Sequence, residues 1–149
     1  MNLTAVDPAI RRCILQTLAS GAVPTRLSVM QALDLEYLQV AMSYAALAAG
    51  HAIVLDPDTG EVWMAMPFSA VPTDVPVVAA GRALWANCSW DAFGIAAALD
   101  VDVSFVSPCP TSGVPIAAGV RRGVAFAAAG VVAHVAVPAP QWWDDIGYT

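Results

Sequence analysis

The chain contains no lysine, few charged residues of either sign and only two histidines. Its 149 residues include six basic and twelve acidic ones, which give a net charge of −6 and an isoelectric point near 4.4. Domains that bind nucleic acid normally carry a basic patch or stripe that contacts phosphates. The composition therefore argues against a nucleic-acid partner.

Long apolar runs are also missing, although 58% of the residues are hydrophobic. The best candidates, VAMSYAALAAG and GVAFAAAGVVAHVAV, are rich in alanine and interrupted by Ser, Gly or His. A membrane-spanning helix needs about 20 predominantly apolar residues. The first residues, MNLTAVDPAIRRC, also lack a basic segment followed by an apolar signal. We therefore expect a cytoplasmic protein with a large core and no membrane partner.

Residues 1–66 predict a winged-helix-like part. Apolar spacing predicts helices over 7–21, 28–33 and 36–49, with Asp7 as the first N-cap and Gly50 just beyond the third helix. The segment HAIVLDPDTGEVWMAM then predicts a hairpin that turns at 56–60, with His51 at the surface. Winged helices commonly bind DNA, but the third helix carries no positive charge for a DNA groove.

Residues 67–149 predict a second part that completes an α+β fold. The proline-rich PFSAVPTDVPVVAAG is typical of a linker or an edge segment, and a helix is expected to begin near Cys88 or Ser89. Strand-like alternation follows in DVDVSFVSP, and GVAFAAAGVVAHVAVP predicts one or two further strands. We expect the winged-helix-like part to pack on a mixed or antiparallel sheet, with the reactive cysteine on the helix.

The cysteine count is odd and no export signal precedes it, so Cys13, Cys88 and Cys109 are expected to be free thiols. Cys13 lies on the apolar stripe of the first helix and is expected in the core. Cys88 would lie where unpaired backbone N–H groups and the helix dipole favour a thiolate, which predicts a lowered pKa.

Asp91 follows Cys88 by one helical turn and would face the same side. It could act as a capping carboxylate or exchange a proton with a molecule bound at the sulfur. A C-x-x-D spacing alone does not decide between these roles. The pair is expected to bind a soft metal, and the neighbouring side chains of Trp85, Asn87 and Trp90 are candidates for the walls of a pocket.

Four separated motifs resemble the alkylmercury lyase (organomercurial lyase) family. PFSAVPT, WANCSWDAFGIAAAL, SPCPTSGVPI and WWDDIGYT occur in the family's order, and the resemblance runs from about Val23 to the last residue. It implies that protein thiols capture mercury while an aspartate protonates the departing carbon. Cys88 matches the first catalytic cysteine, Asp91 matches the catalytic aspartate, and Cys109 matches a structural cysteine.

The resemblance further implies a bacterial protein whose partner is a small-molecule substrate. No cofactor is required, because mercury is a substrate ion, and external small thiols could assist. One departure concerns the second catalytic cysteine, which should lie just before the HV of GVVAHVAV. Val132 and Ala133 occupy that place. Mercury prefers two thiolates in a near-linear arrangement, as expected for a soft ion.

This departure leaves several alternatives open. Cys109 or an external thiol could supply the second sulfur of a working lyase. The scaffold could instead catalyse another cysteine-dependent lyase or hydrolase-type reaction on a small organic molecule, or hold a thiophilic metal without catalysis. His134, expected in a strand, is either an accessory proton donor or a core residue. Trp142 and Trp143 are either core or pocket walls, and the oligomeric state stays open.

Overall fold

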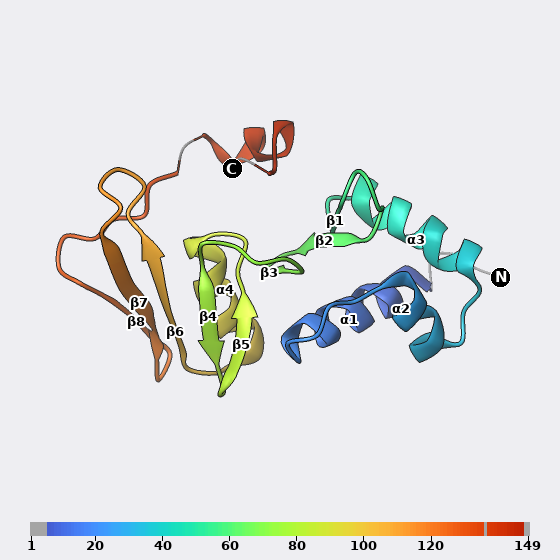
Figure 1. Cartoon of the computed structure of the whole chain (residues 1–149), viewed down its shortest axis with the longest axis horizontal. Coiled ribbons are helices and arrows are strands. Elements are labelled where there is room, and N and C mark those ends of the chain that lie inside the picture. The colour runs from blue at the N-terminus through green and yellow to red at the C-terminus, as the bar shows by residue number, and fades with distance from the viewer. Residues whose placement is uncertain (1–5, 136, 148–149) are drawn as a thin grey trace.

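The computed structural model describes residues 6–135 and 137–147, with side chains from Pro8 onward. Three helices come first and are followed by a small sheet, then by a larger sheet with one helix (Figure 1). Tyr148 and Thr149, at the end of the terminal motif, lie outside the described residues. The N-terminal helices are α1 (Val6–Ala19), α2 (Arg26–Leu33) and α3 (Tyr37–Ala49). None of the helices in the described part combines the length and apolarity needed to cross a bilayer.

The ends of the helices follow from local hydrogen bonds. The hydroxyl of Thr25 accepts a hydrogen bond from the N–H of Ser28, and the Ser28 hydroxyl accepts one from the N–H of Thr25. This capping box starts α2 at Arg26, two residues earlier than expected. At the end of α3, Gly50 has a φ of −87° and His51 adopts the left-handed conformation, with a φ of 58°. Gly50 lies just beyond the helix as predicted, but the C′ position with left-handed backbone, which the sequence assigned to this glycine, is taken by His51. His51 closes the helix, because its N–H and that of Ala52 reach back into the last turn.

The hairpin turn forms where the sequence predicts it. A side-chain oxygen of Asp56 accepts the N–H groups of Asp58 and Thr59, and Gly60 has a φ of 69°. The small antiparallel sheet has the order β1-β2-β3, so a third strand joins the hairpin beyond Pro67. Its strands are β1 (Val54–Leu55), β2 (Val62–Ala65) and β3 (Phe68–Ser69).

The larger sheet is antiparallel throughout, in the order β5-β4-β6-β7-β8. Its strands are β4 (Pro76–Ala79), β5 (Arg82–Trp85), β6 (Val103–Pro108), β7 (Pro115–Arg121) and β8 (Val124–Ala127). β4 pairs on both sides, so the prediction of a linker or an edge segment was wrong there. Pro76 is tolerated because it is the first residue of the strand.

Helix α4 (Ser89–Leu99) packs against β4, β6 and β7. Ala92, Ile95 and Ala96 of this helix are buried, and they meet the apolar face of the sheet that includes Val77 and Phe105. The same continuous core includes the inward side chains of the three N-terminal helices. The combination of helices and antiparallel sheets confirms the predicted α+β class.

The segment after β8 differs from the expectation. Residues 131–135 form neither helix nor strand, so the second strand predicted in GVAFAAAGVVAHVAVP is not formed among the described residues. β7 was missed because its alanine and glycine residues give no alternating pattern. A short 3-10 helix, η2 (Ala139–Asp144), follows and contacts the N-terminal part, where the ring of Trp143 stacks on His51 with centroids 3.9 Å apart.

Candidate active site

The chain segment that leads into α4 is held by two contacts. After β5, Ala86 forms a bridge with Phe68 of the small sheet, and its carbonyl accepts the hydroxyl of Thr73 at 2.6 Å. Ala86 is fully buried. These contacts fix the backbone immediately before Asn87 and Cys88, so the start of the helix has a defined position.

Cys88 is the N-cap of α4. Its extended backbone (φ −148°, ψ 176°) precedes the first helical residue, and its carbonyl accepts the N–H of Ala92 at 3.2 Å. The half-buried side chain makes no capping hydrogen bond to the helix, although the sulfur lies near the first backbone N–H groups of α4. The predicted position of the thiol at the start of a helix is confirmed.

Asp91 lies in the first turn of α4, next to Cys88 and Asn87. The amide Nδ2 of Asn87 donates to Oδ2 of Asp91 at 3.1 Å, and the Cys88 thiol shares a hydrogen bond with the same carboxyl group. Asn87 immediately precedes the N-cap, and its side chain extends to the first turn of α4, where Asp91 lies. The structure therefore brings Asn87, Cys88 and Asp91 together in one hydrogen-bonded group.

The surroundings of Asp91 shift the pKa of its carboxyl group. Burial raises the pKa of the Asp91 carboxyl group above its ordinary value, and the hydrogen bonds from Asn87 and Cys88 offset part of this effect. A carboxyl group with a raised pKa holds a proton at a higher pH than usual. Such a group is suited to receive a proton from a neighbouring thiol and to pass it on.

The pKa of Cys88 differs from the expectation. Burial raises the pKa of the thiol, and the negative charge of Asp91 adds to the increase. The helix N–H groups do lower it, as the sequence argument assumed, but their effect is smaller than that of burial. The prediction of a lowered pKa was therefore wrong, because it considered the helix end without its surroundings.

Two further residues shape the site and were missed from the sequence. A Cβ atom placed on Gly94 would lie 3.0 Å from Cβ of Pro67 and 4.0 Å from Oδ1 of Asp91. Gly94 therefore lets Pro67 pack closely against α4 beside the carboxylate. A glycine within a helix is unfavourable by about 1 kcal/mol relative to alanine, so its presence in FGIAAAL is the signal that could have pointed to this contact.

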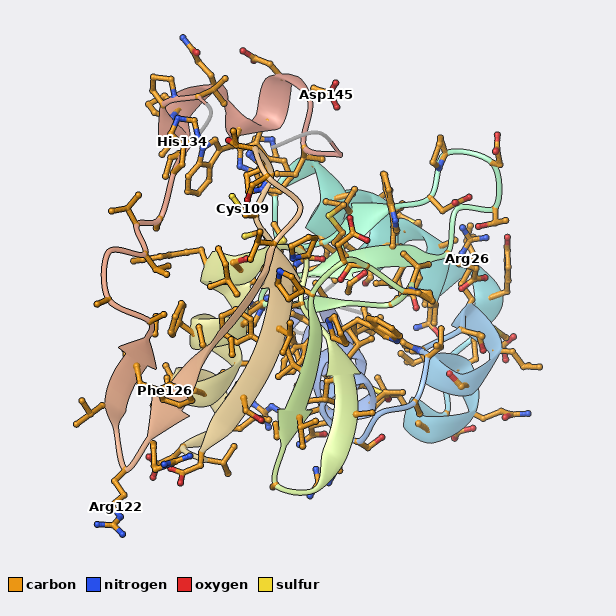
Figure 2. All side chains as sticks on the ribbon, turned by 60° about the vertical axis from the view of Figure 1, so that its left-hand side comes forward. Arg26, Cys109, Arg122, Phe126, His134 and Asp145 are labelled. Atoms are coloured by element: carbon orange, nitrogen blue, oxygen red, sulfur yellow. The ribbon has the colours of Figure 1, made fainter. Side chains whose placement is uncertain are left out.

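Cys109 follows β6, which returns the chain to the end of α4 that carries Cys88. The hydroxyls of Ser89 and Ser107 form a hydrogen bond of 3.2 Å between these two segments. Figure 2 shows Cys109 at one end of the large sheet and Arg122 at the other. Hydrogen bonds from Ser112, followed by the N–H of Thr111, lower the pKa of the Cys109 thiol. All three cysteines are free thiols.

The other predicted site residues are more dispersed. Trp85 is half-buried, whereas Trp90 is 68% exposed and lines a hollow of about 560 Å³ beside Phe93 and Arg122. Neither Cys88 nor Asp91 lines this hollow. His134 is exposed and lies outside any strand, and Val132 is 81% exposed.

The C-terminal tryptophans have partners of their own. The indole N–H of Trp142 donates to the carbonyl of Val137 at 2.9 Å, and Trp143 stacks on His51. In the described residues, no group of three or more His, Cys, Asp or Glu side chains is arranged to hold a metal ion. A mercury ion that takes two ligands does not need such a group.

The segment that carries this thiol and carboxylate matches a known protein family. Residues 68–149, more than half of the chain, match the family model described as alkylmercury lyase. The fold is similar to the crystal structure of the mercury-bound form of MerB2, with a TM-score of 0.68 and 28% sequence identity. No curated protein matches the chain.

These observations define an α+β protein with a thiol–carboxyl pair at a helix N-terminus. The chain belongs to the alkylmercury lyase family, as its sequence motifs indicated. The MerB2 match covers 80% of this chain and 58% of the MerB2 chain, so the chain corresponds to little more than half of that protein.

Proposed function

We propose that this chain cleaves the carbon–mercury bond of small organomercurial compounds. The observation that carries the proposal is the hydrogen-bonded group of Asn87, Cys88 and Asp91 at the start of α4. In this group a soft sulfur ligand and a proton-accepting carboxyl group lie in direct contact. Both are required when a metal–carbon bond is exchanged for a carbon–hydrogen bond.

The first step binds the organomercurial cation to sulfur. Cys88 forms a sulfur–mercury bond and displaces the small-molecule thiolate that was bound to mercury, while the proton of the Cys88 thiol passes to ionised Asp91. The pKa of the thiol is raised, so Cys88 is protonated at neutral pH and has a proton to transfer. The raised pKa of Asp91 makes the carboxyl group a suitable acceptor.

The second step breaks the carbon–mercury bond. Asp91 returns the proton to the carbon, which uses the electron pair of the carbon–mercury bond to form the carbon–hydrogen bond. The products are a hydrocarbon, an ionised Asp91 and mercury(II) on the sulfur of Cys88. External thiols then remove mercury(II), which restores the thiol. Mercury is a substrate in this scheme, and no cofactor takes part.

Mercury prefers two sulfur ligands, and Cys88 supplies one of them. The second comes from a small thiol or from Cys109. Val132 and Ala133 stand where the family pattern expects a cysteine. Cys109 lies two residues beyond Ser107, whose hydroxyl contacts the residue after Cys88, and its lowered pKa favours a thiolate. We assign residues 67–149 to this chemistry and residues 1–66 to a winged-helix-like supporting part.

The test measures benzene release from a phenylmercury salt by the reduced protein in excess small thiol. Wild type should release several equivalents of benzene per protein, and Cys88→Ser should release none above the protein-free rate. Cys13→Ala is the matched control, since Cys13 packs against the core away from α4, and it should behave as wild type. Stoichiometric mercury binding by wild type without benzene would instead indicate a thiophilic-metal-binding protein.

A further inference from the structure

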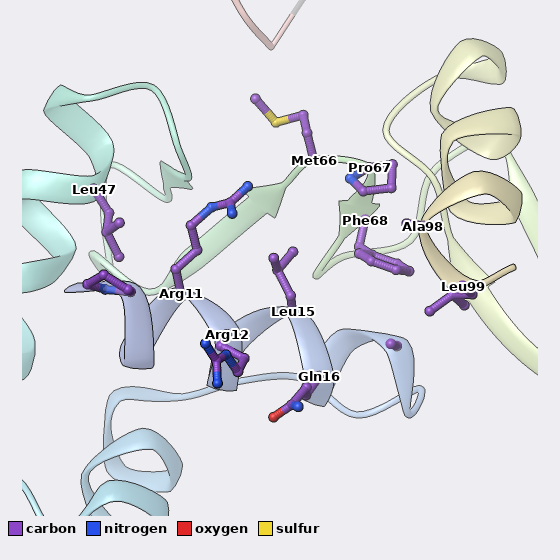
Figure 3. Close-up of a pocket in the computed structure, with 12 residues that line it drawn as sticks. Arg11, Arg12, Leu15, Gln16, Leu47, Met66, Pro67, Phe68, Ala98 and Leu99 are labelled. Carbon is purple, nitrogen blue, oxygen red and sulfur yellow. The ribbon is translucent and has the colours of Figure 1, made fainter. Parts of the chain in front are cut away.

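A groove lies between the N-terminal helices and α4, separate from the thiol site. It has a volume of about 870 Å³, within the range of about 300–1,000 Å³ that is usual for small-molecule sites. Its apolar walls come from α1, from the segment around the Met66–Pro67 bond and from the end of α4 (Figure 3). The main apolar side chains are those of Leu15, Met66, Pro67, Phe68 and Leu99.

The charged side chains of the groove all have one sign. Arg11 and Arg12 of α1 line it, and the only other polar side chain among the described lining residues is Gln16. No carboxylate appears among these lining residues, although the protein as a whole has a net charge of −6. Two of the six arginines of an acidic protein therefore line one apolar groove, and Figure 3 shows the side chain of Arg11 extending toward Met66.

The groove and the thiol site share a wall but no ligating atom. Pro67 lines the groove and also packs on Gly94, next to the carboxylate of Asp91. Ala98 and Leu99, near the other end of α4, complete the groove, whereas Cys88 and Asp91 are absent from its described lining. A molecule in the groove would therefore contact the scaffold near the site without touching the reacting sulfur.

We propose that this groove binds a small amphipathic anion, with its apolar body against Leu15, Phe68 and Leu99 and its carboxylate on Arg11, while the positive charge of Arg12 adds to the attraction. The guanidinium group suits a carboxylate because its N–H groups match the two oxygens. The apolar walls remove the remainder of the ligand from water. This site is additional to the mercury chemistry and does not depend on it.

The test is calorimetric titration of the full chain with decanoate, below the concentration at which decanoate forms micelles. Decyltrimethylammonium is the matched probe of opposite charge. Decanoate should bind with one-to-one stoichiometry, and the cation should bind at least about tenfold more weakly, because the only described charges of the groove are positive. Equal binding of both probes would show simple apolar adsorption and would overturn the proposal, as would no binding of decanoate.

Variants locate the bound anion. Arg11→Gln combined with Arg12→Gln should weaken decanoate binding by about tenfold or more, as expected for loss of charge-assisted hydrogen bonds. Arg122→Gln is the matched control, because this arginine lies at the far end of the large sheet (Figure 2), and it should bind as wild type. An unchanged affinity in the double variant would overturn the proposal.

Two further variants keep the test independent of charge and of mercury. Ala98→Phe adds a ring at an exposed position of the groove wall and should block decanoate while α4 still folds. Cys88→Ser should bind decanoate with wild-type affinity. Loss of binding in Cys88→Ser would place the anion at the thiol site and contradict a separate groove. None of these binding measurements uses a mercurial. An absence of decanoate binding would therefore not bear on the proposed lyase activity, which benzene release tests separately.

Discussion

Cys88 lies just before α4 and Cys109 just after β6, the next strand along the chain. The surroundings of the two thiols shift their pKa values in opposite directions. Cys88 caps α4, is half-buried and contacts Asp91, and its pKa is raised. Cys109 follows β6 in an open turn, and the hydroxyl and N–H groups of that turn lower its pKa. The Ser89–Ser107 hydrogen bond joins these two environments. Position at a helix N-terminus therefore does not by itself produce a reactive thiolate.

This difference separates two properties that are often combined in one cysteine. Cys109 ionises more readily, whereas Cys88 keeps its proton to a higher pH and lies beside a carboxyl group. Protonolysis of a carbon–mercury bond needs a proton at the site as well as sulfur. We therefore assign the reaction to Cys88, although the pKa of Cys109 is lowered.

The largest expected effect concerns removal of each thiol in turn. Cys88→Ser should reduce benzene release from a phenylmercury salt by about 100-fold or more, since the sulfur beside Asp91 is lost. Cys109→Ser should retain most of the rate when an external thiol is in excess, because that thiol can accept mercury. Rates of benzene release measured side by side check this prediction. A larger loss in Cys109→Ser than in Cys88→Ser would reverse the assignment.

The order of alkylation tests the two pKa shifts directly. A thiolate forms as the pH rises through the pKa, so Cys109, with its lowered pKa, should react with iodoacetamide at a lower pH than Cys88. At pH 7.5 Cys109 should be modified first. Peptide mapping by mass spectrometry over a range of pH gives both profiles. Prior modification of Cys88 would contradict the raised pKa of its thiol.

Asp91→Asn removes the negative charge beside Cys88 and leaves the surroundings of Cys109 unchanged. The pKa of Cys88 should fall, and its alkylation at pH 7.5 should accelerate several-fold while that of Cys109 is unchanged. Asp74→Asn is a suitable control, since Asp74 is exposed.

The same variant has an effect on stability. The pKa of Asp91 is higher in the folded than in the unfolded chain. As the pH rises above about 4, the carboxyl group therefore ionises more readily in the unfolded chain, and the free energy of unfolding decreases. Asp91→Asn should therefore melt at a higher temperature than wild type at pH 7, and the difference should shrink toward pH 3. A variant that melts lower at pH 7 would show that the carboxylate stabilises the fold.

The smallest expected effect concerns the turn around Cys109. Ser112→Ala removes the hydroxyl that contributes most to the lowered pKa of this thiol. Alkylation of Cys109 at pH 7.5 should slow by about twofold to fivefold, in the range of one exposed hydrogen bond. Cys88 serves as the internal control in the same peptide map, and slower modification of both thiols would point to a general change of structure.

Local sequence signals predicted much of the fold. Apolar spacing identified α1 and α3, the Asp-Pro-Asp-Thr-Gly turn identified the hairpin, and the start of α4 fell at Cys88 as expected. β7 was missed because its alanine and glycine residues give no alternating pattern, although it pairs with β6 across a short turn. There Gly119 is required, since a Cβ would collide with the Val103 carbonyl and the ring of Phe126.

The sequence predicted which residues form the candidate site, but not the direction in which the pKa of Cys88 is shifted. The spacing of Cys88 and Asp91 was sufficient to place them together, and the family motifs indicated their roles. The raised pKa of Cys88 could not be predicted, because it arises from burial of the thiol in the folded chain. The exposure of His134 depends in the same way on a strand that does not form in the described residues.

The most direct measurement follows mercury and benzene together in wild type and in Asp91→Asn. Each protein, in excess over a phenylmercury salt, is incubated at pH 7.5, and bound mercury and released benzene are then quantified. We predict that both proteins bind all of the added mercury, that wild type releases benzene and that Asp91→Asn releases little or none. Equal benzene release by the two proteins would contradict the assignment of Asp91 as the group that delivers the proton.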